Sequence, residues 1–527
     1  MRFWRPFIPR LHTTDALFKG RQCRHYVRLS VSFIFRIWIG AAILLAAPSG
    51  MVRADSTQPD LTLHGMFTGK DNHTYRLVSF TVPSGVTRIT VQFEYTGREE
   101  HTTLDLGLFD PNGFRGWSGG NKSVFTVSPS DATPSYLPGA IIPGEWQLIV
   151  GVPNIRTDSI SWFTATIYFS RSGRVADEPS ILMPVLRQEA AWYRGDLHSH
   201  TAHSDANCQS QSGKYAPCPL FLSAEAAVRR RLDFLAITDH NTTSHFSEIR
   251  ELQPYFDRLL LIPGREITTF QGHANLYGTT DFTDFRVGGD SIPAWNVFLQ
   301  KLPARDVLLS VNHPSRPTGE ACMGCGWHPD PDVDWHLIHV IEAVNGDDTD
   351  GPMSGIDFWQ RRLNLGLHIT AIGGGDNHNS LAAIPGPPSI GYPTTVVHAP
   401  QLSTPAILEA IRAGHVFIDV SGTSDRLLEF TAESEAGQAK MGDTLHLSKG
   451  AETSFGIHVS HATDGHIEVI QDGELTSVLQ TSELNQPDQF FSFAWKSDGR
   501  RHWLRINVRG PNGKLWLVGN PIFINFD

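Results

Sequence analysis

The sequence predicts a multidomain α/β protein in which a central barrel of parallel strands is flanked by an N-terminal β-sandwich and a small C-terminal β-sandwich. The chain of 527 residues is long for a single domain. Residues 190–422 alternate apolar strand-like runs with helical patterns, whereas residues 55–175 and 425–527 show short β-type runs separated by turns. Five central apolar runs end in His, Asp or Glu, and a parallel barrel gathers its strand ends on one face.

Residues 1–54 predict a secretory signal peptide that is cleaved after Ala54. The segment holds nine Arg or Lys residues, one acid and an apolar run at residues 37–47. The alternative is an uncleaved membrane anchor formed by residues 37–47, although eleven residues are short for a span that needs about twenty. We therefore expect an exported protein, either periplasmic or extracellular.

The charge of the mature chain argues against nucleic acid and anionic membranes as partners. Without the leader, 34 basic and 53 acidic residues remain, which gives a net charge of −19. Both kinds of partner need a basic face on the protein. The expected partner is a small-molecule substrate, with no stable membrane partner once the leader is removed.

Four cysteines lie beyond the leader, in two pairs. Cys208 and Cys218 are ten residues apart in a polar loop and can form a bridge, whereas Cys322 and Cys325 form a Cys-x-x-Cys motif. In an exported protein a disulfide is favoured over a zinc knuckle, because no second pair completes four ligands. Redox catalysis by Cys322 and Cys325 is the remaining alternative.

The N-terminal region has the pattern of a β-sandwich and resembles the jelly-roll accessory modules of secreted hydrolases. Its alternating runs are residues 75–82, 87–95, 104–109, 146–151 and 162–169. Aromatic residues such as Trp117 can contact a glycan there, or can simply pack against the sandwich. Residues 173–190 are expected to form a linker.

The central region predicts buried strands and two clear helices. The strands are expected at residues 234–238, 259–262, 307–311, 337–341 and 369–372. One helix is expected over 223–232, with Ser223 as its N-cap, and another over 403–412, ending before Gly414.

The C-terminal region returns to β patterning and predicts an immunoglobulin-like sandwich without a catalytic grouping. Its runs are residues 453–459, 466–470, 490–495 and 503–508, with turns at 472–473 and 510–513.

Polar residues near the central strand ends predict a metal site. The candidates are His198, His200, Asp205, Asp239, His240, Glu266, His273, His313, Asp376 and His378. Nitrogen and carboxylate ligands without thiolate suit Zn, Mn or Fe(II). The set is too large for one tetrahedral ion, so we expect two to three divalent ions that share Glu266 as a bridge. Such ions favour hydrolysis by a metal-bound hydroxide.

The motifs in this region together resemble the PHP (polymerase and histidinol phosphatase) superfamily. They are Asp-Leu-His-Ser-His at 196–200, His-Ser-Asp at 203–205, Thr-Asp-His at 238–240, Gly-Arg-Glu at 264–266, Asn-His-Pro at 312–314 and Asp-Asn-His at 376–378. The stretches 264–268 and 272–275 look like the CehA/McbA branch of metallohydrolases. The resemblance covers residues 190–420 and implies a distorted (β/α)7 barrel with up to three metals.

The resemblance also implies an assignment of ligands. The first ion would be held by His198, His200, Glu266 and Asp376, the second by Glu266, His273 and His313, and the third by Asp205, His240 and His378. Asp239 is expected either to orient a ligand histidine or to act as a plain capping residue. His203 is expected to lie outside the site.

Glu266, Asp376 and His378 are the expected catalytic residues, together with Arg265 and Arg316. A guanidinium group beside the site suits a phosphate oxyanion, although each arginine can equally pair with a neighbouring carboxylate. Members of the PHP superfamily commonly cleave phosphomonoesters or phosphodiesters, so the resemblance implies phosphoester hydrolysis as the predicted activity. The alternatives are hydrolysis of carboxylic esters or carbamates, which the CehA/McbA likeness implies, and an exported glycan- or surface-binding protein with an inactive barrel.

Overall fold

The computed structural model describes residues 58–526, apart from 303–306, 321, 384–385 and 387–388. These residues belong to one compact unit, Ser56–Asp527. The predicted signal peptide, and the anchor that is its alternative, lie outside the described residues. Within the described ranges, no helix combines the length and the apolar character that crossing a membrane requires.

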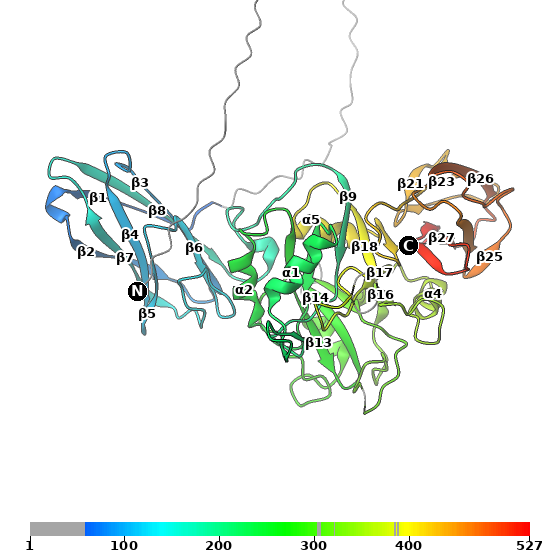
Figure 1. Ribbon diagram of the computed structural model, residues 1–527, viewed down its shortest axis with the longest axis horizontal. Coiled ribbons are helices and arrows are strands. Elements are labelled where there is room, and N and C mark those ends of the chain that lie inside the picture. Colours follow the sequence, from blue (N-terminus) through cyan, green and yellow to red (C-terminus); the bar gives the residue numbers. More distant parts are fainter. Residues whose placement is uncertain (1–57, 303–306, 321, 384–385, 387–388, 527) are drawn as a thin grey trace, which may run out of the picture. The chain divides into compact units, whose positions relative to one another are not determined.

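The first part of the unit is a pair of four-stranded antiparallel sheets, drawn in blue and cyan in Figure 1. One sheet has the order β1 (Leu61–Thr68), β8 (Ile160–Ser170), β3 (Arg88–Tyr95) and β6 (Val124–Val127). The other has the order β2 (Thr74–Val82), β7 (Gly144–Asn154), β4 (Thr103–Asp110) and β5 (Gly113–Gly119). Alternate residues of both sheets, such as Val91, Leu106 and Trp146, are fully buried in one shared core.

A buried ionic cluster links this part of the chain to residues further along. Arg88 contacts Asp131 at 2.6 Å and Glu178 at 3.6 Å, and Arg250 pairs with the same two carboxylates. The two carboxylates and Arg88 are almost completely buried. Loss of one partner from such a cluster leaves an uncompensated buried charge, which costs about 3–5 kcal/mol.

The central part contains nine neighbouring strands of a fifteen-stranded mixed sheet. Its strands, in spatial order, are β17 (Thr370–Gly374), β16 (Val340–Asn345), β15 (Leu308–Val311), β14 (Gly272–Tyr277), β13 (Leu260–Thr269), β12 (Phe234–Ile237), β9 (Ala191–Asp196), β18 (Thr394–Ala399) and β19 (Val416–Asp419). Every residue of β12, β15 and β16 is buried, as the continuous apolar runs predict. A separate hairpin pairs β10 (Asn207–Gln209) with β11 (Tyr215–Pro217).

The prediction of a distorted (β/α)7 barrel is wrong. The described residues are 11% helical and 42% strand, with only five α-helices. Only two residues join β13 to β14, so these strands form an antiparallel hairpin, and β14 is also antiparallel to β15. Strand β18 is antiparallel to both β9 and β19. Repeated parallel β/α units therefore do not build this sheet.

The five helices all lie in the central part of the described chain. They are α1 (Leu220–Arg229), α2 (His245–Leu252), α3 (Trp295–Lys301), α4 (Ile356–Asn364) and α5 (Thr404–Arg412). Helix α5 matches the prediction, with Ser403 as its N-cap residue. Helix α1 begins three residues before Ser223, so that residue lies inside the helix, and its hydroxyl contacts Ser380 at 2.6 Å.

The C-terminal strands form a four-stranded sheet and continue the central one. The separate sheet has the order β21 (Gly437–Lys440), β20 (Leu427–Ser434), β23 (Glu452–Ser460) and β26 (Asp488–Lys496). The fifteen-stranded sheet extends from β19 through β28 (Leu515–Gly519), β27 (His502–Arg509), β24 (His466–Gln471) and β25 (Glu474–Thr476), with β29 (Ile522–Ile524) and β22 (Thr444–Leu445) beside them. A shared core containing Phe417, Phe455 and Leu517 holds these layers together.

Candidate metal centre

Asp196 ends β9 and fixes the loop that carries the first two histidines. Its Oδ1 accepts hydrogen bonds from the backbone amides of His198 and Gly375, and its Oδ2 accepts one from Gly391. Burial raises the pKa of Asp196 to about 6, although these hydrogen bonds oppose the rise. Asp196 therefore shapes the backbone around the site, while His198 and His200 lie beyond the strand rather than in it.

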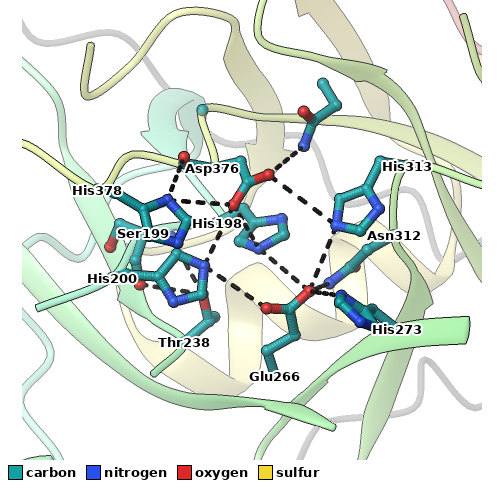
Figure 2. A network of polar contacts seen from close by, with 12 residues as sticks. His198, Ser199, His200, Thr238, Glu266, His273, Asn312, His313, Asp376 and His378 are labelled. Carbon is teal, nitrogen blue, oxygen red and sulfur yellow. Dashed lines mark hydrogen bonds and ion pairs between the residues drawn. The ribbon is translucent and has the colours of Figure 1, made fainter. Parts of the chain in front are cut away.

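Glu266 lies at the centre of a cluster of imidazoles, as Figure 2 shows. It sits in the middle of β13 rather than at a strand end, because that strand continues to Thr269. Its carboxylate is buried and lies between 2.8 and 3.5 Å from ring nitrogens of five residues: His198, His200, His240, His273 and His313. This position is the one that a bridging carboxylate requires.

Asp376 faces Glu266 from the loop after β17 (Figure 2). Its carboxylate lies 3.2 Å from His200, 3.4 Å from His198, 3.7 Å from His378 and 4.0 Å from His313. The two carboxylates thus enclose His198, His200 and His313 from opposite sides.

Asp205 completes an outer group of ligands. Its Oδ1 lies 3.3 Å from Nε2 of His378 and 3.6 Å from Nε2 of His240. The structure thereby brings all nine predicted metal ligands into one region. Four groups within it can hold a metal ion: His200–Asp205–His240–His378, His198–Glu266–His313, His198–His200–Asp376 and His273–His313–Cys325.

Several buried polar atoms in the cluster make no hydrogen bond. They are Nε2 of His198, both ring nitrogens of His200 and Oε2 of Glu266. Three of them do lie beside another ligand without hydrogen-bond geometry: Oε2 of Glu266 is 2.8 Å from His240, and the two Nε2 atoms are 3.2–3.5 Å from carboxylates. A buried polar atom without a partner costs about 1–3 kcal/mol, and native proteins contain few of them. Divalent cations would supply the missing partners, since imidazole nitrogens and carboxylate oxygens are their ordinary ligands. The residues therefore fit a metal centre.

The electrostatics of the cluster favour bound positive charge. Burial raises the pKa of Glu266, but the nearby His198, His240 and His273 outweigh that effect and hold the pKa well below its usual range. Burial lowers the pKa of His200 to about 4, which keeps its imidazole neutral and able to donate a lone pair.

Contacts behind the ligands orient them. Nδ1 of His198 contacts Oε2 of Glu342 at 2.7 Å, and the amide of Asn312 donates to Oε1 of Glu266 at 2.9 Å. The hydroxyl of Thr268 contacts Nδ1 of His240 at 2.6 Å. None of these three supporting residues was among the predicted site residues. Glu342 and Asn312 carried a usable signal, since each directly follows an apolar run, whereas Thr268 did not.

The backbone is constrained at the same place. His313 and Asp376 have φ values of +26° and +49°, which non-glycine residues adopt at a cost of about 1–3 kcal/mol each. Gly374 permits close packing behind the site, because a Cβ there would lie 2.5 Å from Oε2 of Glu342. The candidate ligands His313 and Asp376 are therefore held in place at the cost of an unfavourable backbone conformation.

The cluster opens into a cavity of about 730 Å³, which Arg316 also lines. Two nitrogens of Arg316 lie 3.1 and 3.2 Å from Asp348, and a third lies 3.9 Å from Asp376. Both interpretations of this arginine are therefore compatible with its position: it pairs with a carboxylate, and it borders the space above the ligands.

Arg265, unlike Arg316, does not border the cavity. It follows Gly264 and precedes Glu266 on β13, so its side chain points to the opposite face of the strand. It is buried, it does not line the cavity, and its guanidinium lies over the ring of Phe282 at 5.6 Å. Burial lowers its pKa to about 10.

Asp239 and His203 hold the loop that follows His200. Asp239 accepts hydrogen bonds from the backbone and hydroxyl of Thr201 and from Ser204, so it braces this loop rather than contacting a ligand imidazole. His203 contacts Ser244 and Glu248 and lies outside the cluster, as expected.

The structure joins Cys208 to Cys218 and Cys322 to Cys325 as disulfides. The second pair lines the cavity beside the ligands.

Comparison with models of known protein families gives no match, and comparison with curated protein sequences gives none either.

Proposed function

We propose that this chain is an exported, metal-dependent hydrolase that acts on phosphoester bonds. The observation that carries the proposal is the position of Glu266, whose buried carboxylate contacts five imidazoles while Asp376 faces it. The order of the sequence motifs resembles that of PHP metallohydrolases. This adds support, because the order of the motifs is independent of the (β/α)7 barrel that the structure lacks.

The ligands separate into an inner and an outer group. His198, His200, His273 and His313 are buried beside the central carboxylates, whereas Asp205, His240 and His378 are more exposed. Two to three Zn, Mn or Fe ions held by these groups would lower the pKa of bound water and polarise the bond to be cleaved.

The chain's own residues then bind and orient the substrate. Arg316 places a cationic group within 3.9 Å of Asp376, where it can bind a phosphate oxygen. His378 is 37% exposed at its side chain, the most open imidazole of the set. It would serve either as a metal ligand or, when it binds no cation, as a group that exchanges a proton with the leaving group.

A second candidate is the hydrolysis of carboxylic esters or carbamates. The observation that favours it is the pairing of Arg316 with Asp348, which neutralises the cationic group that would attract a phosphate. The same metal ligands serve both reactions, so the two candidates differ in the charge of the substrate. Glycan contact through the N-terminal sheets remains a separate prediction.

Metal analysis and a panel of four substrates test the proposal. Purified protein is assayed with p-nitrophenyl phosphate, bis-p-nitrophenyl phosphate, p-nitrophenyl acetate and a naphthyl carbamate. We expect metal-dependent cleavage of at least one phosphate ester. Carbamate or acetate turnover without phosphate-ester turnover would replace this function with the second candidate, and no turnover of any substrate would favour a binding protein.

Glu266→Gln provides the matching test of the site. We expect loss of both metal and activity, because the amide cannot bridge cations as a carboxylate does. Glu248→Gln is the control, since Glu248 contacts His203 outside the cluster. Equal effects of the two substitutions would remove Glu266 from its central role.

A further inference from the structure

The loop that contains Cys322 and Cys325 lies directly against two of the candidate ligands. The backbone carbonyl of Met323 lies 3.3 Å from Nε2 of His273, and that of Cys325 lies 3.1 Å from Nδ1 of His313. Cys322, Met323 and Cys325 all line the same cavity as the metal ligands. The loop therefore contributes to the site and is not a remote structural bridge.

The sulfur of Cys325 is close enough to become a ligand itself. Its Sγ and one ring nitrogen each of His273 and His313 all lie within 4.8 Å of one another, and all three residues are buried. Imidazole nitrogen and thiolate sulfur are both ordinary zinc ligands and occur together in zinc sites. In the disulfide, however, this sulfur is bonded to Cys322 and carries no thiolate charge.

We propose that reduction of the Cys322–Cys325 disulfide turns Cys325 into a metal ligand beside His273 and His313. This inference rests on the proposed metal centre but does not depend on the reaction that the centre catalyses. The Cys-x-x-Cys loop is then a thiol-dependent part of the centre, which changes its ligand set with the redox state of the surroundings.

The chemistry balances with a dithiol as the reductant. The dithiol supplies two electrons and two protons, the Cys322–Cys325 bond breaks to give two thiols, and the reductant becomes a disulfide. The Cys325 thiol then releases its proton as its sulfur binds the cation. Cys322 stays a free thiol at the edge of the cavity.

Cobalt substitution tests this directly, because thiolate-to-cobalt charge transfer absorbs in the near-ultraviolet whereas imidazole and carboxylate ligands give no such band. The full chain is loaded with Co²⁺ and its spectrum is recorded before and after a phosphine reductant, which takes up oxygen from water as the disulfide is reduced. We expect the band only after reduction.

Two matched variants make the assignment specific. Cys322→Ser leaves the sulfur of Cys325 free, so its band should be present without reductant. Cys325→Ser should lack the band with or without reductant, although Cys322, which lines the cavity, and Cys23, Cys208 and Cys218 remain. A band that persists in Cys325→Ser, or that is missing from both Cys322→Ser and the reduced parent protein, would overturn the proposal. Cobalt binding without hydrolysis would contradict the proposed function and leave this inference intact.

Discussion

Oε2 of Glu342 lies 2.7 Å from Nδ1 of His198, and both side chains are completely buried. A carboxylate accepts hydrogen bonds, so this contact places a proton on Nδ1 of His198. Nε2 then faces Glu266 and Asp376, where it would bind a cation. A short contact from Asn345 holds Glu342 in turn. Two residues without access to the cavity thereby set the orientation of one central ligand.

Removing the Glu342 carboxylate should weaken metal binding without removing a ligand. We expect Glu342→Ala to lower metal affinity about 10- to 100-fold, the usual effect of losing such a partner. Glu342→Gln should lose less, because its amide oxygen can still accept the proton of His198. Metal titration of both variants checks this order, and equal affinities in the two would contradict it.

Metal removal should destabilise the folded chain. Cations that bind only the folded state add about 2.7 kcal/mol at a concentration one hundred times their Kd. We expect the unfolding temperature to fall with a chelator and to recover with added Zn²⁺ or Mn²⁺. The Glu266→Gln variant should show a much smaller difference, and a shift of the same size in it would place the stabilising ion elsewhere.

Arg316 should separate the two candidate substrates. Loss of a hydrogen bond to a charged group costs about 1.5–3 kcal/mol, so Arg316→Ala should lower kcat/KM for p-nitrophenyl phosphate by about 10- to 100-fold. The rate with neutral p-nitrophenyl acetate should change little. Arg316→Lys should recover part of the phosphatase rate, since it keeps the charge but loses the fork. A similar fall with both substrates would indicate a structural role.

Asp131 should make stability depend on acid pH. Burial raises its pKa, but Arg250 and Arg88 reverse that effect and hold the pKa far below the ordinary value of 3.8. The folded state therefore binds this proton more weakly than the unfolded chain does. The resulting stability is complete above pH 3.8 and is lost progressively as the pH falls below that value.

Urea unfolding of Asp131→Asn measures this contribution. The parent protein should exceed the variant by about 3–5 kcal/mol near neutral pH, with the difference shrinking in acid. Asp71→Asn, at an exposed ion pair with Arg76, should cost no more than about 1 kcal/mol. A difference at Asp131 that stays constant down to pH 2 would contradict the assignment.

The leader makes a separate prediction. Exported protein should begin near Asp55, because cleavage is expected after Ala54. N-terminal sequencing of the secreted or periplasmic fraction checks this. Full-length chain in the membrane fraction would support the anchor formed by residues 37–47.

The sequence was most informative where buried strands lead into polar residues. The apolar runs before His240 and His313 correspond to β12 and β15, and their ligands meet in space. That signal is local, since it needs only a buried strand followed by a metal-binding side chain. It located the candidate ligands without establishing how the strands are ordered.

The order of the strands and the contacts that support the ligands could not be predicted, because both are formed by residues far apart in the sequence. A run of apolar residues does not reveal whether its neighbour is parallel, so the β13–β14 hairpin and the resulting mixed sheet were missed. Arg265 looked equivalent to Arg316 because each adjoins a ligand, yet strand alternation turns it away from Glu266. Glu342 is 144 residues from His198, a separation that no motif spans.

The β13–β14 hairpin has a consequence for recognising related proteins. Thr268 pairs with His273 across it, and Glu266 lies on the same face of β13 as Thr268, so the interval of seven residues brings both ligands together. A shift of this pairing by one residue would send His273 to the other face of the sheet. Divergent sequences that build their centre this way should therefore tolerate many substitutions between Glu266 and His273, and a longer turn only where the pairing of Thr268 with His273 is kept. The pairing of a ligand histidine opposite the residue two places after the central glutamate is therefore the feature to look for in such sequences.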